Sequence, residues 1–216
     1  MIILGLTGSI AMGKSTTAAL LRRLGLPVHD ADAAVHALTG PGGAAVDAVG
    51  KAFPGTVKKG AVDRAALGRK VLGDPAALKR LEAILHPLVR ASERRFLAGH
   101  ARRRTPLVVL DIPLLFETGG ERRCDAVLAV HCRPALQRRR ALARPGMDAA
   151  RFEATLARQL PAREKVKRAD FAVDTGLGRA RVLRELQAIV KLLGTWEGRA
   201  WAPDRSARPG RNRRRR

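Results

Sequence analysis

The feature that most constrains this chain is a loop near its start, "GSIAMGKS", which runs from Gly8 to Ser15. The apolar run "IILGL" before it predicts a buried parallel strand, and a helical pattern follows from Lys14 to a stop at Gly25. The loop matches G-x-x-x-x-G-K-[ST] in the strand–loop–helix context that gives this pattern its meaning. The next segment, "LPVHDAD", predicts a second strand, so the chain opens as a βαβ unit.

The chemistry of such a loop is specific. Consecutive backbone amides and the positive end of the following helix bind phosphate, and a glycine permits close backbone approach. The lysine reaches the β- and γ-phosphates, and the serine hydroxyl is offered to Mg²⁺. An ordinary glycine turn with an exposed lysine is the alternative, which the flanking elements disfavour. We therefore predict a site for a nucleoside triphosphate with Mg²⁺ at Gly8, Ser9, Ile10, Ala11, Met12, Gly13, Lys14, Ser15 and Thr16.

Three further apolar runs complete the pattern of an α/β protein. The segments "PLVVLDIP", "DAVLAVHC" and "ADFAVDTG" each predict a strand, and a closing helix is expected at 177–193. Helical stretches at 33–104, with the longest helix at 75–97, and at 134–167 separate these strands. No strand signal of comparable strength interrupts the first stretch. We expect a doubly wound parallel sheet of about five strands, with helices on both sides and two helical insertions at strand ends.

Composition narrows the possible partners only in part. The 216 residues, 46% of them hydrophobic, suit one compact unit. The net charge of +23 suggests a polyanionic partner such as nucleic acid, an anionic membrane or a phosphorylated small molecule. Only 9 of the 42 basic residues are Lys, however, and Tyr is absent, so a GC-rich coding bias would explain the charge as well. Residues 197–216 carry +6 of the charge and predict a disordered basic tail without a defined role, a weak nucleic-acid or lipid contact being the alternative.

The two cysteines and the hydropathy pattern bear on the compartment. Cys124 and Cys132 have no second pair and no histidine cluster nearby, so reduced, partly buried thiols are expected rather than a zinc site or a disulfide. The opening run "MIILGL" is too short for a signal-peptide core, and no apolar stretch approaches the roughly 20 residues of a membrane span. We therefore expect a soluble cytoplasmic protein.

Acidic residues at the other strand ends suggest what is done to the phosphate. The Asn-Lys-x-Asp sequence with which GTPases read guanine is absent. Asp30 and Asp32 follow the second strand, and one of them suits a helix N-cap. We assign catalysis to Asp32, which could accept the proton of an attacking hydroxyl or help to hold Mg²⁺. Asp111 follows four apolar residues, as a Walker B aspartate does, and could assist Mg²⁺ directly or through water.

An arginine pair provides a second candidate group. Arg140 and Arg144 are four residues apart and are expected on one helix face, with Arg138 and Arg139 pointing elsewhere. Two guanidinium groups on a mobile helix would clamp the transferring phosphate and close over the site. An exposed arginine-rich surface is the alternative in so arginine-rich a chain.

With these residues in place, the sequence resembles the dephospho-coenzyme A (CoA) kinase family. The matching stretches are "GLTGSIAMGKST", "VHDADAAVHAL", "LHPLVR", "VVLDIPLLFETG" and the series "QRRRALAR…ARQL…EK…ADFAVDTG", within residues 1–193. The resemblance implies phosphorylation of the ribose 3′-hydroxyl of dephospho-CoA by ATP, the final step of CoA synthesis. It also implies a nucleotide-binding core (1–35, 105–133 and 168–196), a helical acceptor-binding domain (36–104) and a lid (134–167).

Carried over by position, the resemblance makes Asp32 the general base, Lys14 the γ-phosphate lysine, and Arg140 and Arg144 the lid arginines. It assigns the acceptor pocket to His86, Arg90, Pro113, Leu114, Leu115 and Glu117. Taken alone, the histidine would more often be a packed helix residue and the two leucines core. We expect a monomer acting on the small molecules ATP and dephospho-CoA, with no specific nucleic acid and no membrane partner. The alternatives are a nucleoside or nucleoside monophosphate kinase, and a P-loop nucleic-acid-binding ATPase anchored by the tail.

The chain departs from the family pattern in two places. Ser9, Ala11 and Met12 stand where the loop usually has further glycines, and Ala11 would be strained by roughly 1 kcal/mol or more if its position required a positive φ. Thr175 stands where asparagine is common after the last strand, which leaves the adenine contacts near "DTG" open.

Overall fold

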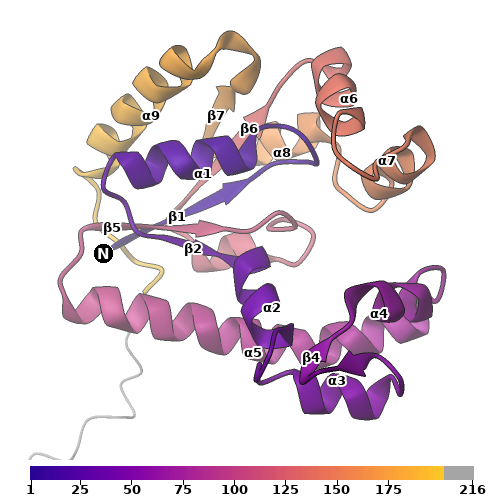
Figure 1. Ribbon diagram of the computed structural model, residues 1–216. Coiled ribbons are helices and arrows are strands. Elements are labelled where there is room, and N and C mark those ends of the chain that lie inside the picture. Colours follow the sequence, from indigo (N-terminus) through magenta and orange to yellow (C-terminus); the bar gives the residue numbers. More distant parts are fainter. Residues whose placement is uncertain (202–216) are drawn as a thin grey trace, which may run out of the picture.

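The computed structural model describes residues 1–201 and has a five-stranded parallel sheet at its centre (Figure 1). The strand order is β2–β5–β1–β6–β7, and every neighbouring pair is parallel. This arrangement confirms the expected doubly wound α/β fold. The strands are β1 (Ile2–Thr7), β2 (Val28–Asp30), β5 (Leu107–Asp111), β6 (Ala126–His131) and β7 (Phe171–Asp174).

The central strands are apolar because helices cover both faces of the sheet. Every residue of β1 and β5 is buried, as expected for parallel strands between two helical layers. Helices α1 (Lys14–Arg23) and α9 (Arg179–Leu193) pack on one face, whereas α5 (Pro75–Arg102) crosses the other (Figure 1). The carboxyl ends of all five strands therefore meet at one edge, where ligands bind in sheets of this kind.

Helix α5 extends from the sheet into the first helical insertion. Asp74 caps its start with hydrogen bonds from the amides of Ala76 and Ala77, and Pro75 occupies its first turn. Its late residue Leu97 packs under the sheet, whereas its early residue Leu81 belongs to a separate core in the insertion. One helix thus joins two hydrophobic cores and extends beyond the predicted range 75–97.

The first insertion holds three short helices and a small hairpin that the sequence did not predict. The helices are α2 (Ala31–Thr39), α3 (Val46–Ala52) and α4 (Arg64–Val71), and all three contact α5. The antiparallel strands β3 (Val57–Lys58) and β4 (Ala61–Val62) form only two residue pairs. Strands of two residues are too short to show the alternation by which strands are recognised.

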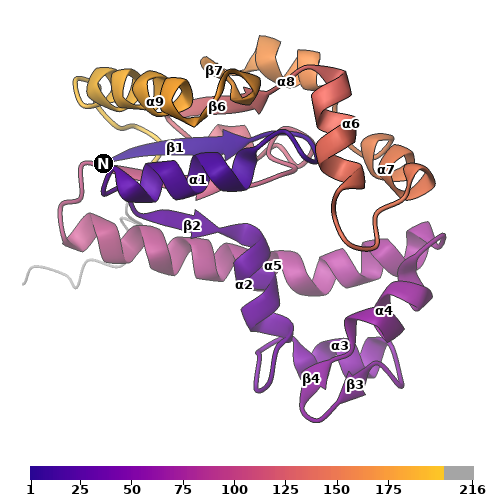
Figure 2. The same ribbon diagram turned by 45° about the horizontal axis from the view of Figure 1, so that its top comes forward.

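The second insertion divides into three helices, α6 (Pro134–Leu142), α7 (Ala149–Leu156) and α8 (Ala162–Arg168). Gly146, at φ 72°, lies in the turn between the first two, and Pro161 precedes the third. Figure 2 shows α6 and α7 and the module of α2 to α4 extending on the same side, beyond the strand ends. Short 3₁₀ turns, η1 (Gly120–Arg123) and η2 (Thr175–Leu177), complete the described elements.

The start of the predicted tail is packed rather than disordered. The Asp125 carboxylate accepts hydrogen bonds from the amides of Arg199 and Ala200. Trp201 packs against the apolar cluster of Ile3 and Leu97. The Asp125 carboxylate and this apolar cluster therefore hold residues 199–201 of the predicted tail against the core. The rest of the tail lies outside the described residues.

Two further expectations concern the thiols and membranes. Cys132 is buried and Cys124 half-buried, and both are free thiols, so one is more deeply buried than the sequence suggested. Among residues 1–201, no helix has the length and apolar character to span a membrane.

Candidate active site

The loop between β1 and α1 takes its shape from glycine. Gly13 precedes α1 with φ 91°, and a Cβ added there would lie 2.8 Å from Thr175 Oγ1. No side chain caps α1, so the amides of its first turn are open to an anion. The loop borders a cavity of about 730 Å³, here called the donor cavity. The expected residues Gly8 to Thr16 all line it except Met12, whose side chain is buried against Cys132.

Ala11 adopts the backbone conformation in which an alanine is strained. Its φ is 59°, so the left-handed geometry considered in the sequence analysis is present, at a cost of about 1 kcal/mol. Its methyl group is buried in a cluster with Ala141 of α6 and Phe152 of α7. The side chain that glycine would lack thus links the phosphate loop to the second insertion.

Lys14 projects from α1 and is held by a buried carboxylate. Its Nζ lies 2.7 Å from Asp111 Oδ1, and the Asp111 side chain is only 2% exposed. Burial raises the pKa of Asp111, and the facing Lys14 ammonium opposes that rise. The sequence placed this aspartate near Mg²⁺; in the structure one of its oxygens is already bonded to the lysine. Asp111 therefore fixes the lysine at the donor cavity.

The two aspartates at the carboxyl end of β2 have separate positions. Asp30 is the N-cap of α2 and accepts a hydrogen bond from the Ala33 amide at 3.0 Å. Asp32 lies in the first helical turn, is exposed, and lines the donor cavity. The structure thus gives the capping role to Asp30 and leaves the Asp32 carboxylate open to a ligand, in the division that the sequence analysis assigned.

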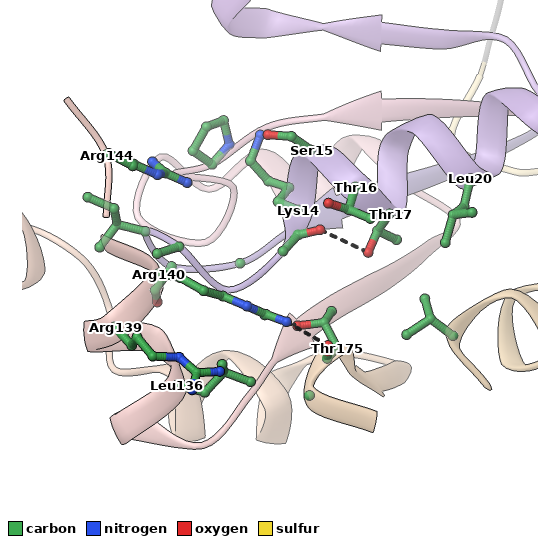
Figure 3. A pocket seen from close by; sticks show the side chains of 18 of the residues that line it. Lys14, Ser15, Thr16, Thr17, Leu20, Leu136, Arg139, Arg140, Arg144 and Thr175 are labelled. Carbon is green, nitrogen blue, oxygen red and sulfur yellow. Dashed lines mark hydrogen bonds between the residues drawn. The ribbon is translucent and has the colours of Figure 1, made fainter. Parts of the chain in front are cut away.

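Arg140 connects α6 to the end of β7. Its Nη1 and Nη2 donate to the hydroxyl and carbonyl oxygens of Thr175, each at 3.0 Å (Figure 3). The Thr175 hydroxyl donates in turn to the Met12 carbonyl at 2.8 Å. Thr175, identified in the sequence only as a departure from the family pattern, therefore connects an arginine of the second insertion to the phosphate loop.

Arg139 and Arg144 do not lie where the expected helix face would place them. Helix α6 ends at Leu142, so Arg144 lies beyond the helix, yet it lines the donor cavity together with Arg140. Arg139, expected to point elsewhere, lines the same cavity. Figure 3 shows these arginines on the α6 side and the residues of α1 on the other. Arg138 pairs with Glu153 at 2.9 Å and is outside the site, as expected.

A second cavity of about 1220 Å³, here called the acceptor cavity, adjoins the first. Among the expected acceptor residues, His86 and Arg90 are exposed on α5 and line it, as does Pro113. Arg123 donates to the Glu93 carboxylate at 2.9 and 3.2 Å beside Arg90. Partial desolvation of its guanidinium in the cavity, and then the neighbouring Arg123 charge, lower the pKa of Arg90. Apolar side chains form much of the rest: Leu72, Leu78, Leu81, Leu85, Val89, Leu114 and Met147.

Two expected acceptor residues do not line this cavity. Leu115 is completely buried and packs with Val127 of β6. Glu117 pairs with buried Lys165 of α8 and accepts a hydrogen bond from the Leu160 amide, both at 2.8 Å. Burial lowers the pKa of Lys165, and the Glu117 carboxylate opposes this shift. Both expected residues therefore hold the loop after β5 in place instead of facing the cavity.

The two cavities meet at four residues that line both: Asp32, Pro113, Thr155 and Gln159. The sequence analysis singled out the first two. It missed Thr155 and Gln159 because they belong to the second insertion and to no catalytic motif. For Gln159 the sequence held one signal, the stretch "ARQL", which forms part of the family resemblance; Thr155 lies outside that stretch.

A phosphate loop after β1, arginines facing it and an adjoining apolar cavity define a P-loop kinase for a small molecule. The family model for dephospho-CoA kinase matches residues 2–178. The chain is 69% identical over 163 residues to a dephospho-CoA kinase from Paramagnetospirillum magneticum, covering 76% of this chain and 77% of the relative. It is 56% identical over 190 residues to the enzyme from Mesorhizobium japonicum, with coverages of 88% and 95%. The chain belongs to the dephospho-CoA kinase family.

Solved structures agree with this assignment. TT1252 from Thermus thermophilus has a TM-score of 0.76 at 41% identity, covering 89% of this chain and 97% of that one. The dephospho-CoA kinase from Campylobacter jejuni has a TM-score of 0.66 at 26% identity, with coverages of 89% and 96%. The fold and the sequence therefore indicate the same family.

Proposed function

We propose that this kinase transfers the γ-phosphoryl group of ATP to the ribose 3′-hydroxyl of dephospho-CoA, with Asp32 as general base. As a dephospho-CoA kinase, the chain acts in the final step of CoA biosynthesis. The observation that carries the mechanism is the position of Asp32, which lines both cavities. Its carboxylate takes the hydroxyl proton, the freed oxygen bonds to the γ-phosphorus, and the bridging oxygen leaves with ADP.

The donor cavity supplies charge for the transferring group. Lys14 and the exposed first turn of α1 bind the β- and γ-phosphates, and Arg140 and Arg144 stabilise the γ-phosphoryl oxygens. Arg140 exchanges its hydrogen bonds to Thr175 for phosphate oxygens as α6 and α7 close over the site. The second insertion, residues 134–167, thus acts as the lid.

The donor cavity also suits Mg²⁺. Ser15 is exposed and lines the cavity, and a hydroxyl oxygen is a ligand that this ion accepts beside phosphate oxygens and water. Ser15 would hold the ion directly and Asp111 through water, since the lysine already takes one oxygen of that carboxylate. When bound, Mg²⁺ would neutralise charge on the phosphates.

The acceptor cavity matches two parts of dephospho-CoA. Its apolar side chains suit the pantetheine arm, and the Arg90 guanidinium, with the His86 ring as a further hydrogen-bonding group, suits the pyrophosphate. Leu114 and Pro113 place the loop after β5 along the same cavity. The helical module of residues 36–104 therefore acts as the acceptor-binding domain.

The substitution Asp32→Asn tests the assignment of the base. We expect the rate of CoA formation at saturating substrates to fall by about 100-fold, the range for a general acid–base group. Binding of ADP, measured by calorimetry, should change little because the loop and Lys14 remain. Asp30→Asn is the matched control, since asparagine also caps helices well and Asp30 lines neither cavity. A near-normal rate for Asp32→Asn would remove this carboxylate from the mechanism.

A further inference from the structure

The boundary between the two cavities contains one side chain whose function the mechanism above leaves open. Of the four residues that line both cavities, Asp32 has its proposed role and Pro113 has no polar side chain. The Thr155 hydroxyl donates to the Arg151 carbonyl within its own helix at 2.7 Å. Gln159 remains, with a carboxamide that carries two N–H donors and one acceptor.

The orientation of the Gln159 carboxamide follows from its contact with the phosphate loop. The Ile10 amide donates to Gln159 Oε1 at 2.9 Å. Because a backbone N–H can only donate, the atom facing it must be the oxygen, and the NH₂ group must point away from Ile10. The backbone is held as well, since Ser9 Oγ donates to the Leu160 carbonyl at 3.4 Å. The loop therefore fixes which end of the carboxamide is free.

The hydrogen bonds within residues 1–201 include none from Gln159 Nε2. Gln159 is half-buried at the cavity boundary, and an amide nitrogen there without a partner among the described residues is available to a ligand. Its neutrality also suits the position. A cationic donor at the boundary that Asp32 also lines would attract that carboxylate and make it a poorer base, whereas an uncharged N–H would not.

We propose that Gln159 is a further catalytic residue, whose Nε2–H donates a hydrogen bond to the phosphoryl group as it passes from the donor cavity to the acceptor. This inference rests on the proposed function, because it needs the donor phosphate in one cavity and the acceptor hydroxyl in the other. An oriented donor that contacts developing charge between two reactants stabilises the transition state more than either ground state.

The test compares three variants in steady-state CoA formation and in ADP binding. Gln159→Glu keeps an oxygen to accept from Ile10 but replaces the N–H donors with negative charge. We expect its kcat to fall by about 100-fold, the effect of losing one such donor, with ADP affinity within threefold of wild type. Gln159→Met loses both the N–H donor and the oxygen that accepts the hydrogen bond from the Ile10 amide.

Gln137→Met is the matched control for anchoring. Gln137 Nε2 donates to the carbonyl of the same residue, Ile10, at 2.8 Å, but Gln137 lines neither cavity. The kcat of Gln159→Met should therefore fall at least tenfold further than that of Gln137→Met. Equal losses in these two variants, or a near-normal kcat for Gln159→Glu, would overturn the inference. If the wild-type enzyme formed no CoA, the proposed function itself would fail, and this inference with it.

Discussion

The two cavities meet at four residues but are built in different ways. The donor cavity is built around one continuous segment, the loop from Gly8 and the first turn of α1, whose glycines and amides set the binding geometry; side chains of the second insertion and of the turn after β7 face it. The acceptor cavity is formed by side chains of α5, the loop after β5 and α7, which lie far apart in the sequence. One site therefore depends on backbone conformation and the other on packing between elements.

This difference has consequences for what each site can do. Charge and fixed donors in the first cavity act on the bond that breaks, so changes there should alter the chemical step. Apolar contacts in the second bind a remote part of the acceptor, and losing one should raise KM with less effect on kcat. The comparison would fail if acceptor-cavity variants altered both parameters equally.

The largest effect is expected in the donor cavity, from removal of the Lys14 ammonium. Lys14→Met alone would leave the Asp111 carboxylate buried and unpaired. The test therefore uses the double variant Lys14→Met with Asp111→Asn, in which that charge is removed as well. We expect its kcat to be lower by about 1000-fold, since the γ-phosphate loses its main fixed charge. The measurement is CoA formation at saturating ATP, beside a thermal melt to verify folding. A folded double variant within tenfold of wild type would contradict this role.

A smaller effect is expected in the acceptor cavity. Leu72 is 75% exposed and lines that cavity, so Leu72→Asp should leave the fold intact. Loss of its apolar contact, worth about 1 kcal/mol, corresponds to about a fivefold rise in the KM for dephospho-CoA. The KM for ATP should not change.

Leu192→Asp is the control for this second prediction. Leu192 is exposed on α9 and lines neither cavity, so the same change of charge there should leave both KM values unaltered. A rise in the KM for ATP with Leu72→Asp would show that the cavities are not separable.

The smallest effect is expected at Ala11, where the phosphate loop packs against the second insertion. Ala11→Gly relieves about 1 kcal/mol of strain but removes a buried methyl group worth about 0.8 kcal/mol. The free energy of unfolding in urea should therefore change by less than about 0.5 kcal/mol, because these effects offset each other. Destabilisation by about 2 kcal/mol or more would mean that packing against Phe152 outweighs the strain.

The sequence predicted the donor site better than the acceptor site because the donor site depends on one contiguous loop and the acceptor site on packing between distant elements. The loop residues are contiguous, and each has a role set by local geometry, so every predicted loop residue from Gly8 to Thr16 lines the donor cavity except Met12, whose side chain faces inward. The strands of the sheet were identified by their apolar runs. Leu115 and Glu117 were misplaced because periodicity cannot show which side of an irregular loop faces a cavity. Gln159 was missed because its position depends on how the lid packs against the loop.

The most direct test of the account compares acceptors. Wild-type enzyme with ATP and Mg²⁺ should phosphorylate dephospho-CoA at its ribose 3′-hydroxyl. Its kcat/KM should exceed that for adenosine, uridine or AMP by about 1000-fold or more, because only the larger acceptor gains binding energy from the second cavity. The position of the new phosphate can be read from the product by phosphorus NMR. Turnover confined to adenosine, uridine or AMP would contradict the central claim.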